Sequence, residues 1–133
     1  MKLSPYLNFN GNCAAALKFY EQVLGGTLAS QMTYGESPMA EQTPAEWHDK
    51  IIHAHLIVGG TNLMAADAPP DYFEPAKGTS VLIELPTLEE AERIFAAFAE
   101  GGTVTMPLQA TFWSPGFGMV TDQFGTPWML NCD

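Results

Sequence analysis

Residues 111–131 read TFWSPGFGMVTDQFGTPWMLN, and this stretch carries the strongest fold signal in the chain. Two short strand-like runs, residues 118–121 and 128–131, flank the tetrapeptide Asp-Gln-Phe-Gly at 122–125. Asp in the first position and Gly in the last suit a type I turn, so the stretch predicts a β-hairpin. Upstream, four apolar side chains surround a Ser-Pro-Gly sequence at 114–116, namely Phe112, Trp113, Phe117 and Met119. We therefore expect a loop that presents aromatic surface beside the hairpin.

Length and charge bound the classes of function. A chain of 133 residues suits one domain that buries about two thirds of the surface of its unfolded form. The formal net charge is −10, which would repel a phosphate backbone, so we expect no nucleic-acid partner and attribute the acidity to solubility. The first residues form no apolar leader, and no apolar run approaches the thickness of a bilayer. We expect a cytoplasmic protein without a membrane partner.

Cys13 and Cys132 are too few for a disulfide framework in a domain of this size. Each lies in an apolar context, and neither has a neighbouring Lys, Arg or His that would lower its pKa. We expect two buried thiols rather than a nucleophile.

The first half of the chain alternates between strand and helix patterns. Residues 4–10, 27–34, 51–58 and 62–66 predict strands, and the two-residue sequence Gly59-Gly60 predicts a tight hairpin between the last two. From Cys13, apolar residues recur at helical spacing until Gly25-Gly26, and Asn12 is a candidate N-cap. Residues 35–50 are polar and acidic and predict a lid or partner-facing insertion, with a capped helical turn at 43–46.

The two halves resemble each other at a fixed offset of 101 − 25 = 76 residues. Gly25-Gly26 coincides with Gly101-Gly102, and Leu7, Phe9, Phe19, Thr27 and Leu28 coincide with Ile83, Leu85, Phe95, Thr103 and Val104. In the second half, Thr87 and Glu90 form a capping box before an apolar helical stripe. This self-similarity predicts a duplicated strand-helix-strand-strand-strand module.

Three motifs then identify a family resemblance. Residues 111–131, the sequence Ser-Pro-Tyr-Leu at 4–7, and Phe19-Tyr20 before Gly25-Gly26 are similar to the PhnB-like branch of the vicinal oxygen chelate superfamily, which includes glyoxalase I, bleomycin-resistance proteins and extradiol dioxygenases. The resemblance implies an α+β fold in which two tandem βαβββ modules curl a mixed and antiparallel sheet into a cup with helices outside. It also implies a homodimer, sometimes with exchanged modules. We expect one domain over residues 1–133, with module one at about 3–67, a linker at 68–77 and module two at about 78–133.

Strand polarity then predicts which side chains line the cup. Residues 52, 54, 56 and 58 are uniformly apolar and should pack under a helix, so Ile51, His53, His55 and Ile57 should face the hollow. Counting back from the Gly59-Gly60 turn pairs His55 with Met64. The predicted ligand-binding lining is Tyr6, Asn8, His53, His55, Met64, Ser80, Glu84, Trp113, Phe117 and Met129.

Some of these lining residues are also candidate metal ligands. Two imidazoles and a carboxylate, His53, His55 and Glu84, suit a divalent metal with open positions. The resemblance, however, puts the metal ligands of the superfamily on symmetry-related strands, and here those positions hold Ser4, Ser80, Met129 and a residue within 64–66. None of these is a good ligand for a hard or borderline cation. We therefore expect no cofactor, with a divalent metal at His53, His55 and Glu84 as the alternative.

The leading functional hypothesis is a homodimer that binds a small apolar or aromatic molecule in a concave cleft, without an assigned reaction. His53 and Glu84 are candidate general bases should it be an enzyme. One alternative is a metal-dependent lyase, isomerase or dioxygenase of the superfamily, and another is a drug-binding resistance protein of the bleomycin type. Methyltransferase activity, a label carried by relatives, is not expected, because no glycine-rich loop follows a strand and opens a helix.

Overall fold

A computed structural model describes residues 1–133, which divide into two compact units, Met1–Glu74 and Pro75–Asp133. The boundary falls inside the segment 68–77, where the sequence predicts a linker. A single domain over the whole chain stays a prediction.

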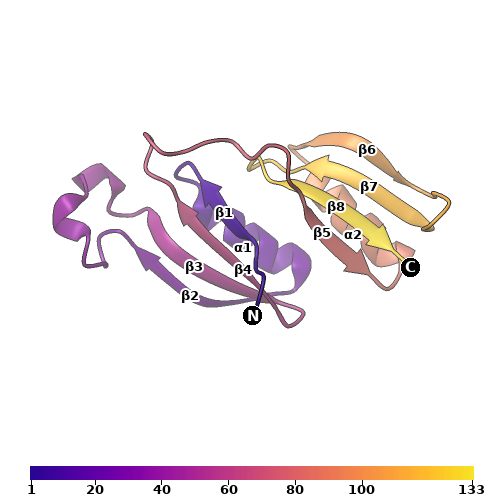
Figure 1. The fold of residues 1–133 in the computed structure, drawn as a ribbon, viewed down its shortest axis with the longest axis horizontal. Helices are drawn as coiled ribbons and strands as arrows, with labels where there is room; N and C mark the ends of the chain where they lie inside the picture. The colour runs from indigo at the N-terminus through magenta and orange to yellow at the C-terminus, as the bar shows by residue number, and fades with distance from the viewer. The chain divides into compact units, whose positions relative to one another are not determined.

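The first unit contains one four-stranded sheet covered on one face by a helix (Figure 1). The strand order is β1-β4-β3-β2; β1 runs parallel to β4, and the other neighbours are antiparallel. In chain order the elements are β1 (Tyr6–Phe9), α1 (Cys13–Leu24), β2 (Thr27–Thr33), η1 (Ala40–Gln42), η2 (Ala45–Trp47), β3 (Ile51–Val58) and β4 (Thr61–Asp67).

The second unit repeats this arrangement. Its sheet has the order β5-β8-β7-β6, again with the first pair parallel and the others antiparallel, and α2 packs on it. The elements are β5 (Val81–Leu85), α2 (Leu88–Ala99), β6 (Thr103–Gln109), β7 (Gly116–Thr121) and β8 (Pro127–Cys132). Two βαβββ modules of identical topology confirm the predicted α+β fold class and the duplication.

Apolar residues at helical spacing attach each helix to its sheet. The buried face of α1 consists of Cys13, Ala16, Leu17 and Tyr20, and that of α2 consists of Ala91, Ile94, Phe95 and Phe98. Phe98 stacks on Trp128 of β8 with ring centroids 4.7 Å apart. Both helices have 12 residues, and no helix is long and apolar enough to cross a membrane.

The N-terminus of α1 is capped by a different residue from the one predicted. Asn12 occupies the N-cap position but makes no side-chain cap hydrogen bond. Instead, Asp67 from the end of β4 accepts hydrogen bonds at Oδ1 from the backbone N–H groups of Gly11 and Cys13, both at 2.9 Å. Its other oxygen accepts from Ile51 N at 2.8 Å. A carboxylate distant in sequence therefore supplies the cap, and it ties the helix to two strands.

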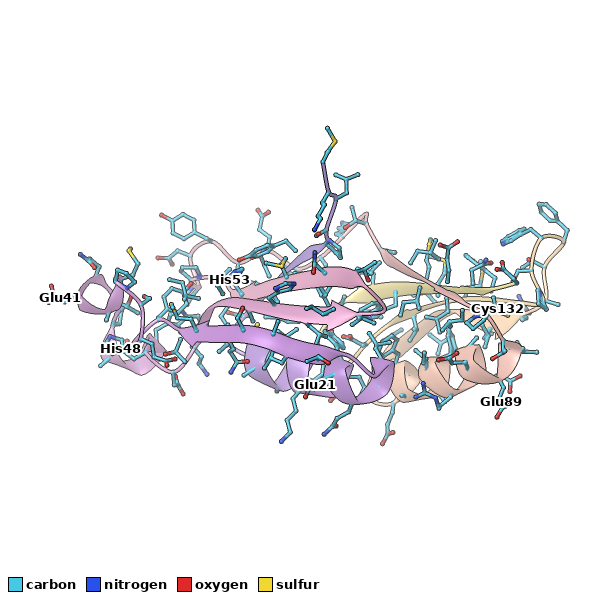
Figure 2. All side chains as sticks on the ribbon, turned by 90° about the horizontal axis from the view of Figure 1, so that it is seen from below. Glu21, Glu41, His48, His53, Glu89 and Cys132 are labelled. Atoms are coloured by element: carbon cyan, nitrogen blue, oxygen red, sulfur yellow. The ribbon has the colours of Figure 1, made fainter.

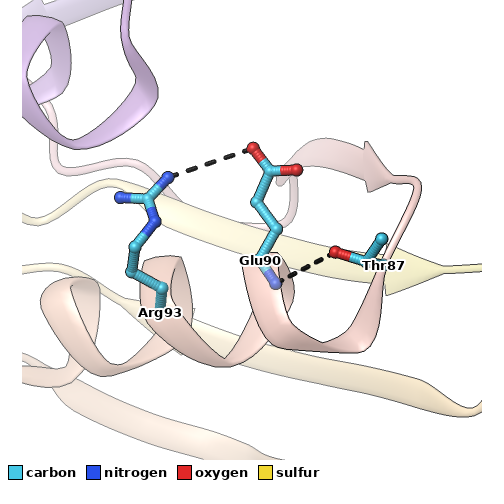
Figure 3. A network of polar contacts seen from close by, with 3 residues as sticks. All are labelled: Thr87, Glu90 and Arg93. Atoms are coloured by element: carbon cyan, nitrogen blue, oxygen red, sulfur yellow. Dashed lines mark hydrogen bonds and ion pairs between the residues drawn. The ribbon is translucent and has the colours of Figure 1, made fainter.

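The start of α2 follows the sequence more closely (Figure 3). Thr87 Oγ1 accepts from Glu90 N at 3.2 Å, which is one half of the predicted capping box. The Glu90 side chain points instead to Arg93, with 4.0 Å between Oε1 and the guanidinium. Both side chains of this ion pair are well exposed, so the cap carries more of the local stability than the pair.

The insertion at 35–50 is a folded loop. Tyr34 N and Gly35 N donate to the carbonyls of Lys50 and His48, which closes its base. His48 Nε2 lies 2.9 Å from Ala40 O and 2.8 Å from Thr43 O. The helical turn predicted at 43–46 is present as η2, but the capping box is wrong: η2 has no side-chain cap, and the Thr43 hydroxyl donates to Met39 O.

Both predicted hairpin turns are confirmed. Gly59 and Gly60 have φ values of 53° and 82°, and Val58 pairs with Thr61 across them. In the second module, Gly125 N donates to Asp122 O, and Asp122 Oδ1 accepts from Phe124 N and Thr126 N. Asp122 Oδ2 accepts from the Trp128 indole at 2.8 Å, so the turn is tied to the core.

Candidate functional site

The face of the first sheet opposite α1 carries the predicted polar residues. On β3, Ala54 and Leu56 are fully buried on the helix side, whereas His53 and His55 are half-buried and Ile57 is exposed. Figure 2 shows His53 on the side of the sheet away from α1. The predicted polarity of β3 is thus confirmed. Ile51 departs from the expectation of an open lining position, since it is only 1% exposed.

Strand register places these side chains in rows across the sheet. Met64 on β4 pairs with Tyr6 on one side and with His55 on the other, and His55 pairs in turn with Ser30 on β2. The predicted pairing of His55 with Met64 is confirmed. His53 pairs with Met32, and its ring lies 6.4 Å from that of Tyr6. Tyr6, Asn8, His53, His55 and Met64 therefore lie on one face of the sheet, which we call the polar face.

A hydrogen bond fixes one of the two histidines. His55 Nε2 lies 2.7 Å from Asn62 Oδ1, a contact between partly buried side chains. Asn62 pairs with Ile57 on β3 and is thus the diagonal neighbour of His55. Because that amide oxygen accepts only, the imidazole N–H is at Nε2 and Nδ1 is left with its lone pair.

Other polar atoms of this face have no partner within the chain. The Tyr6 hydroxyl, the Asn8 amide and the His53 ring nitrogens make no hydrogen bond, and Tyr6 and Asn8 are exposed. Tyr6 is only partly covered by its neighbours, yet this partial burial raises its pKa, and the nearby Cys13 and Tyr34 raise it further. The phenol is therefore protonated at neutral pH and can donate. The polar face offers both donors and acceptors to a molecule that lies on it.

The open face of the second sheet is apolar. Met129, Met119 and Met106 pair in sequence across β8, β7 and β6, and Leu82 of β5 pairs with Met129. Leu82 is 50% exposed and Met106 is 37% exposed. We call this row of four side chains the methionine row. Methionine adapts its shape to what it contacts, which suits a surface that receives an apolar partner.

A second row beside it mixes polar and aromatic side chains. Glu84 pairs with Asn131, and Asn131 pairs with Phe117. The Trp113 indole donates to Asn131 Oδ1 at 3.2 Å and contacts the Phe117 ring at 5.3 Å between centroids. The predicted aromatic cluster beside the hairpin is thus present.

The loop that carries these aromatic residues is firmly anchored. The Ser114 hydroxyl is buried and lies within hydrogen-bond distance of the carbonyls of Gly116 and Cys132, and Thr111 N donates to Ser114 O at 2.8 Å. At its tip Phe112 is 97% exposed and packs edge-on against Trp113. Exposed aromatic residues on an ordered loop are available to a partner or ligand.

The predicted lining residues thus fall into two groups. Tyr6, Asn8, His53, His55 and Met64 share the open face of the first sheet, and Glu84, Trp113, Phe117 and Met129 share that of the second. Ser80 is exposed immediately before β5, and Glu84 is exposed within it. Glu84 makes no ion pair, so no cation within its module occupies the carboxylate.

The donor sets offer a poor fit to a resident metal. No group of three or more His, Cys, Asp and Glu side chains lies within reach of one ion in either module. The positions at which the superfamily resemblance places ligands hold two hydroxyls, Ser4 and Ser80, and the Met129 thioether, which are weak donors for Zn²⁺, Fe²⁺ or Mn²⁺.

Both cysteines are buried and free, as expected. The pKa of Cys13 is raised to about 12, mainly because the thiol is buried and in addition because the Asp67 carboxylate lies nearby. Such a thiol is protonated at physiological pH and is not a nucleophile.

Sequence reasoning missed Asn62 and Asp67. Asn62 could have been found from the Gly59-Gly60 turn, since the same register count that pairs His55 with Met64 sets Asn62 diagonally beside His55. Asp67 carried no local signal, because its three donors are 16 to 56 residues away in sequence.

Comparisons with known proteins agree with this architecture. Residues 2–130 match the profile of the Glyoxalase/Bleomycin resistance protein/Dioxygenase superfamily. Protein YjdN of Escherichia coli (strain K12) is 39% identical over 139 residues, covering 98% of this chain and 95% of YjdN. The crystal structure of protein PA1353 from Pseudomonas aeruginosa is 51% identical, with a TM-score of 0.92 over 100% of this chain and 98% of that one. A PhnB protein from Bacillus cereus, described as a putative 3-demethylubiquinone-9 3-methyltransferase, is 25% identical, with a TM-score of 0.85 over 100% of both chains.

Proposed function

Since this chain belongs to the PhnB-like branch of the glyoxalase/bleomycin resistance protein/dioxygenase superfamily, we propose that it is a cytoplasmic homodimer that binds a small apolar or aromatic molecule in a concave cleft. The proposal assigns binding, and no reaction, to the open sheet faces. It rests first on the methionine row.

The methionine row supports the apolar part of the ligand. Four adjacent strands each contribute one long apolar side chain to the same line, on the face that α2 leaves uncovered. Apolar area removed from water contributes about 25 cal/mol per Å², so a flat apolar molecule laid across this row would gain several kcal/mol before the entropic cost of binding. Phe117 and Trp113 extend the surface with aromatic rings.

The polar face supports a ligand that also carries a few polar groups. Tyr6, Asn8, His53 and His55 offer unpaired donors and acceptors on a face that has no Lys, Arg, Asp or Glu among its paired positions. Such a face suits a small molecule that carries one or two uncharged polar groups.

The observed groups give little support to an enzyme. His53 and Glu84 remain the candidate general bases, yet neither has a hydrogen-bonded orienting partner of the kind that activates a base. The methyltransferase description of the Bacillus cereus protein is not extended to this chain, because no strand is followed by a glycine-rich loop that opens a helix for a nucleotide-like cofactor.

Fluorescence titration tests the proposal with N-phenyl-1-naphthylamine, a neutral apolar probe that becomes bright in apolar surroundings. We expect saturable enhancement by the wild-type protein and an upward shift of its melting temperature. Met119→Gln, at the centre of the methionine row, should weaken binding several-fold. Met39→Gln is the matched control, since Met39 is 51% exposed in the insertion and lies off both sheets.

Three experimental outcomes would contradict the proposed function or favour one of the alternatives. No saturable binding, or equal binding by the Met119→Gln and Met39→Gln variants, rejects the methionine row as the binding surface. A melting temperature that falls when a chelator is added favours the metal-dependent enzyme with His53, His55 and Glu84. Salt-sensitive binding of a cationic aromatic drug in preference to the neutral probe favours the resistance-protein alternative, since the chain carries a net charge of −10.

A further inference from the structure

We infer that His55 selects ligands that bear an O–H or N–H group, accepting their hydrogen bond at Nδ1, and that Asn62 positions it by holding the imidazole proton on Nε2. The inference rests on the proposed binding function and adds to it a recognition rule. His55 contacts the ligand in this scheme, and Asn62 acts only through His55.

The assignment begins with the chemistry of the pair. A neutral imidazole has one N–H and one lone pair, and an amide oxygen can only accept. With His55 Nε2 at 2.7 Å from Asn62 Oδ1, the N–H must be the donor of that bond. The lone pair is then at Nδ1 for as long as the bond persists.

No other group of the chain uses this lone pair. His55 makes no second hydrogen bond, and its row neighbours are Met64 and Ser30. Tyr6, which pairs with Met64 on its other side, is the nearest phenol in the row and is also unpaired. His53 is the other titratable group of β3 on this face.

His53 provides the internal contrast. It lies on the same strand and face, and its ring contacts Tyr6 without any hydrogen bond to fix the proton. His53 can therefore adopt either tautomer, whereas His55 presents one. A fixed tautomer can discriminate between a ligand that donates and a ligand that only accepts.

The first test measures the tautomer directly. Long-range ¹H–¹⁵N correlation spectra at pH 8 should show His55 as the Nε2–H form and His53 as a mixture. Asn62→Leu should convert His55 to a mixture, Asn62→Asp should restore the single form because it keeps an acceptor oxygen, and Asn10→Leu, an exposed position outside the strands, should change nothing. A wild-type His55 with its proton on Nδ1, or an unchanged spectrum in Asn62→Leu, overturns the positioning role.

The second test uses phenol and anisole, two aromatic probes of similar size of which only phenol donates. Followed by shifts of the His55 ring and Met64 methyl signals, phenol should bind about three- to tenfold more tightly, as expected for one hydrogen bond. The preference should disappear in Asn62→Leu and persist in Asn62→Asp and Asn10→Leu. Equal binding of both probes to the wild type, or a preference that survives Asn62→Leu, overturns the selection rule and leaves the proposed function intact. Failure of both probes together with N-phenyl-1-naphthylamine overturns the proposed function as well.

Discussion

Each module contains one buried aspartate, Asp67 or Asp122, whose carboxylate accepts hydrogen bonds from backbone N–H groups that have no backbone acceptor. Each accepts three hydrogen bonds, and each joins segments that would otherwise end with unpaired donors. Asp67 is 1% exposed and bonds Gly11, Cys13 and Ile51, so it connects β4 to both α1 and β3. This makes the residue structural, in contrast to the unpaired polar groups of the open face.

Replacement of Asp67 by Ala should be among the most damaging single changes in the first module. The buried N–H groups of Cys13 and Ile51 and the partly buried one of Gly11 would lose their acceptor. At about 1–3 kcal/mol for each buried group left unsatisfied, we expect a loss of at least about 2 kcal/mol in the free energy of unfolding. Urea denaturation measures it. Asp71→Ala, an exposed acid in the segment 68–77, is the control and should stay within about 0.5 kcal/mol of wild type. A similar small change for Asp67→Ala would contradict the structural role.

The buried thiol of Cys13 should make the stability of the protein depend on pH in the alkaline range. Its pKa is raised to about 12 in the folded protein from an ordinary value of 9.0, so between those values the folded state holds a proton that the unfolded state releases. The stabilisation is complete below pH 9 and is lost as the pH rises toward 12. Above pH 9 the free energy of unfolding of wild type should fall by up to about 1.4 kcal/mol per pH unit more steeply than that of Cys13→Ala. Parallel pH profiles of the two proteins would show that the thiol is not shielded as described.

The sequence supported residue assignments where a short-range rule applied. Strand alternation placed His53 and His55 on the open face, and the hairpin turn paired His55 with Met64. It missed Asp67 because a cap that arrives from a strand 54 residues away leaves no local pattern. For the same reason Asn12 looked like the cap of α1, although its side chain plays no such part.

At the scale of elements, the paired glycines that end each helix explain why the repeat is readable without gaps. Gly25 and Gly101 both have φ of 72°, in the left-handed region that ends a helix with little strain. The second glycine of each pair then passes close to a neighbouring strand: a Cβ on Gly26 would lie 2.8 Å from Ile57 O, and one on Gly102 would lie 2.7 Å from Phe98 O and closer still to Thr121 O. The offset of 76 residues therefore reflects one helix-to-strand crossing that is used twice.

Gly26→Ala and Gly102→Ala should both destabilise the protein. Each methyl group meets backbone oxygen atoms that cannot move away without disturbing a strand or helix, and such overpacking costs about 1–3 kcal/mol. The reduced entropy of the unfolded chain offsets only about 0.4–1 kcal/mol of this. Guanidinium unfolding of both variants beside Gln22→Ala, an exposed position of α1, provides the measurement. Wild-type stability in either glycine variant would mean that the crossing is looser than the geometry indicates.

The order of the elements was predictable, and the connections were less so. Strand and helix patterns placed both helices and six of the strands to within a few residues, and the internal repeat implied the other two, β5 and β6. In the insertion at 35–50 the sequence predicted a capping box from Thr43 and Glu46, yet the Thr43 hydroxyl donates to Met39 O and His48 fixes the carbonyls of Ala40 and Thr43. A ring nitrogen shared by two carbonyls leaves no periodic signal in a sequence.

At the scale of the whole molecule, duplication has given two modules of the same topology with different open faces. Equivalent sheet positions hold Tyr6 and Leu82, His55 and Met119, and Ser30 and Met106. One module is thus polar where the other is apolar, although their helix-facing cores are alike. Each open face therefore favours a different kind of contact, and composition averaged over the chain conceals this divergence.

The proposed homodimer yields a prediction for the intact protein. The loop of the second module exposes a large apolar side chain, Phe112, at 97%, and mutual burial would remove such area from water at about 25 cal/mol per Å². Light scattering should give a mass of 2 × 14.4 = 28.8 kDa, and the melting temperature should rise with protein concentration. Each chain carries a net charge of −10, so the two subunits repel each other and added salt should tighten the association by screening. A mass of 14.4 kDa with a concentration-independent melting temperature, in low and high salt alike, would contradict the homodimer.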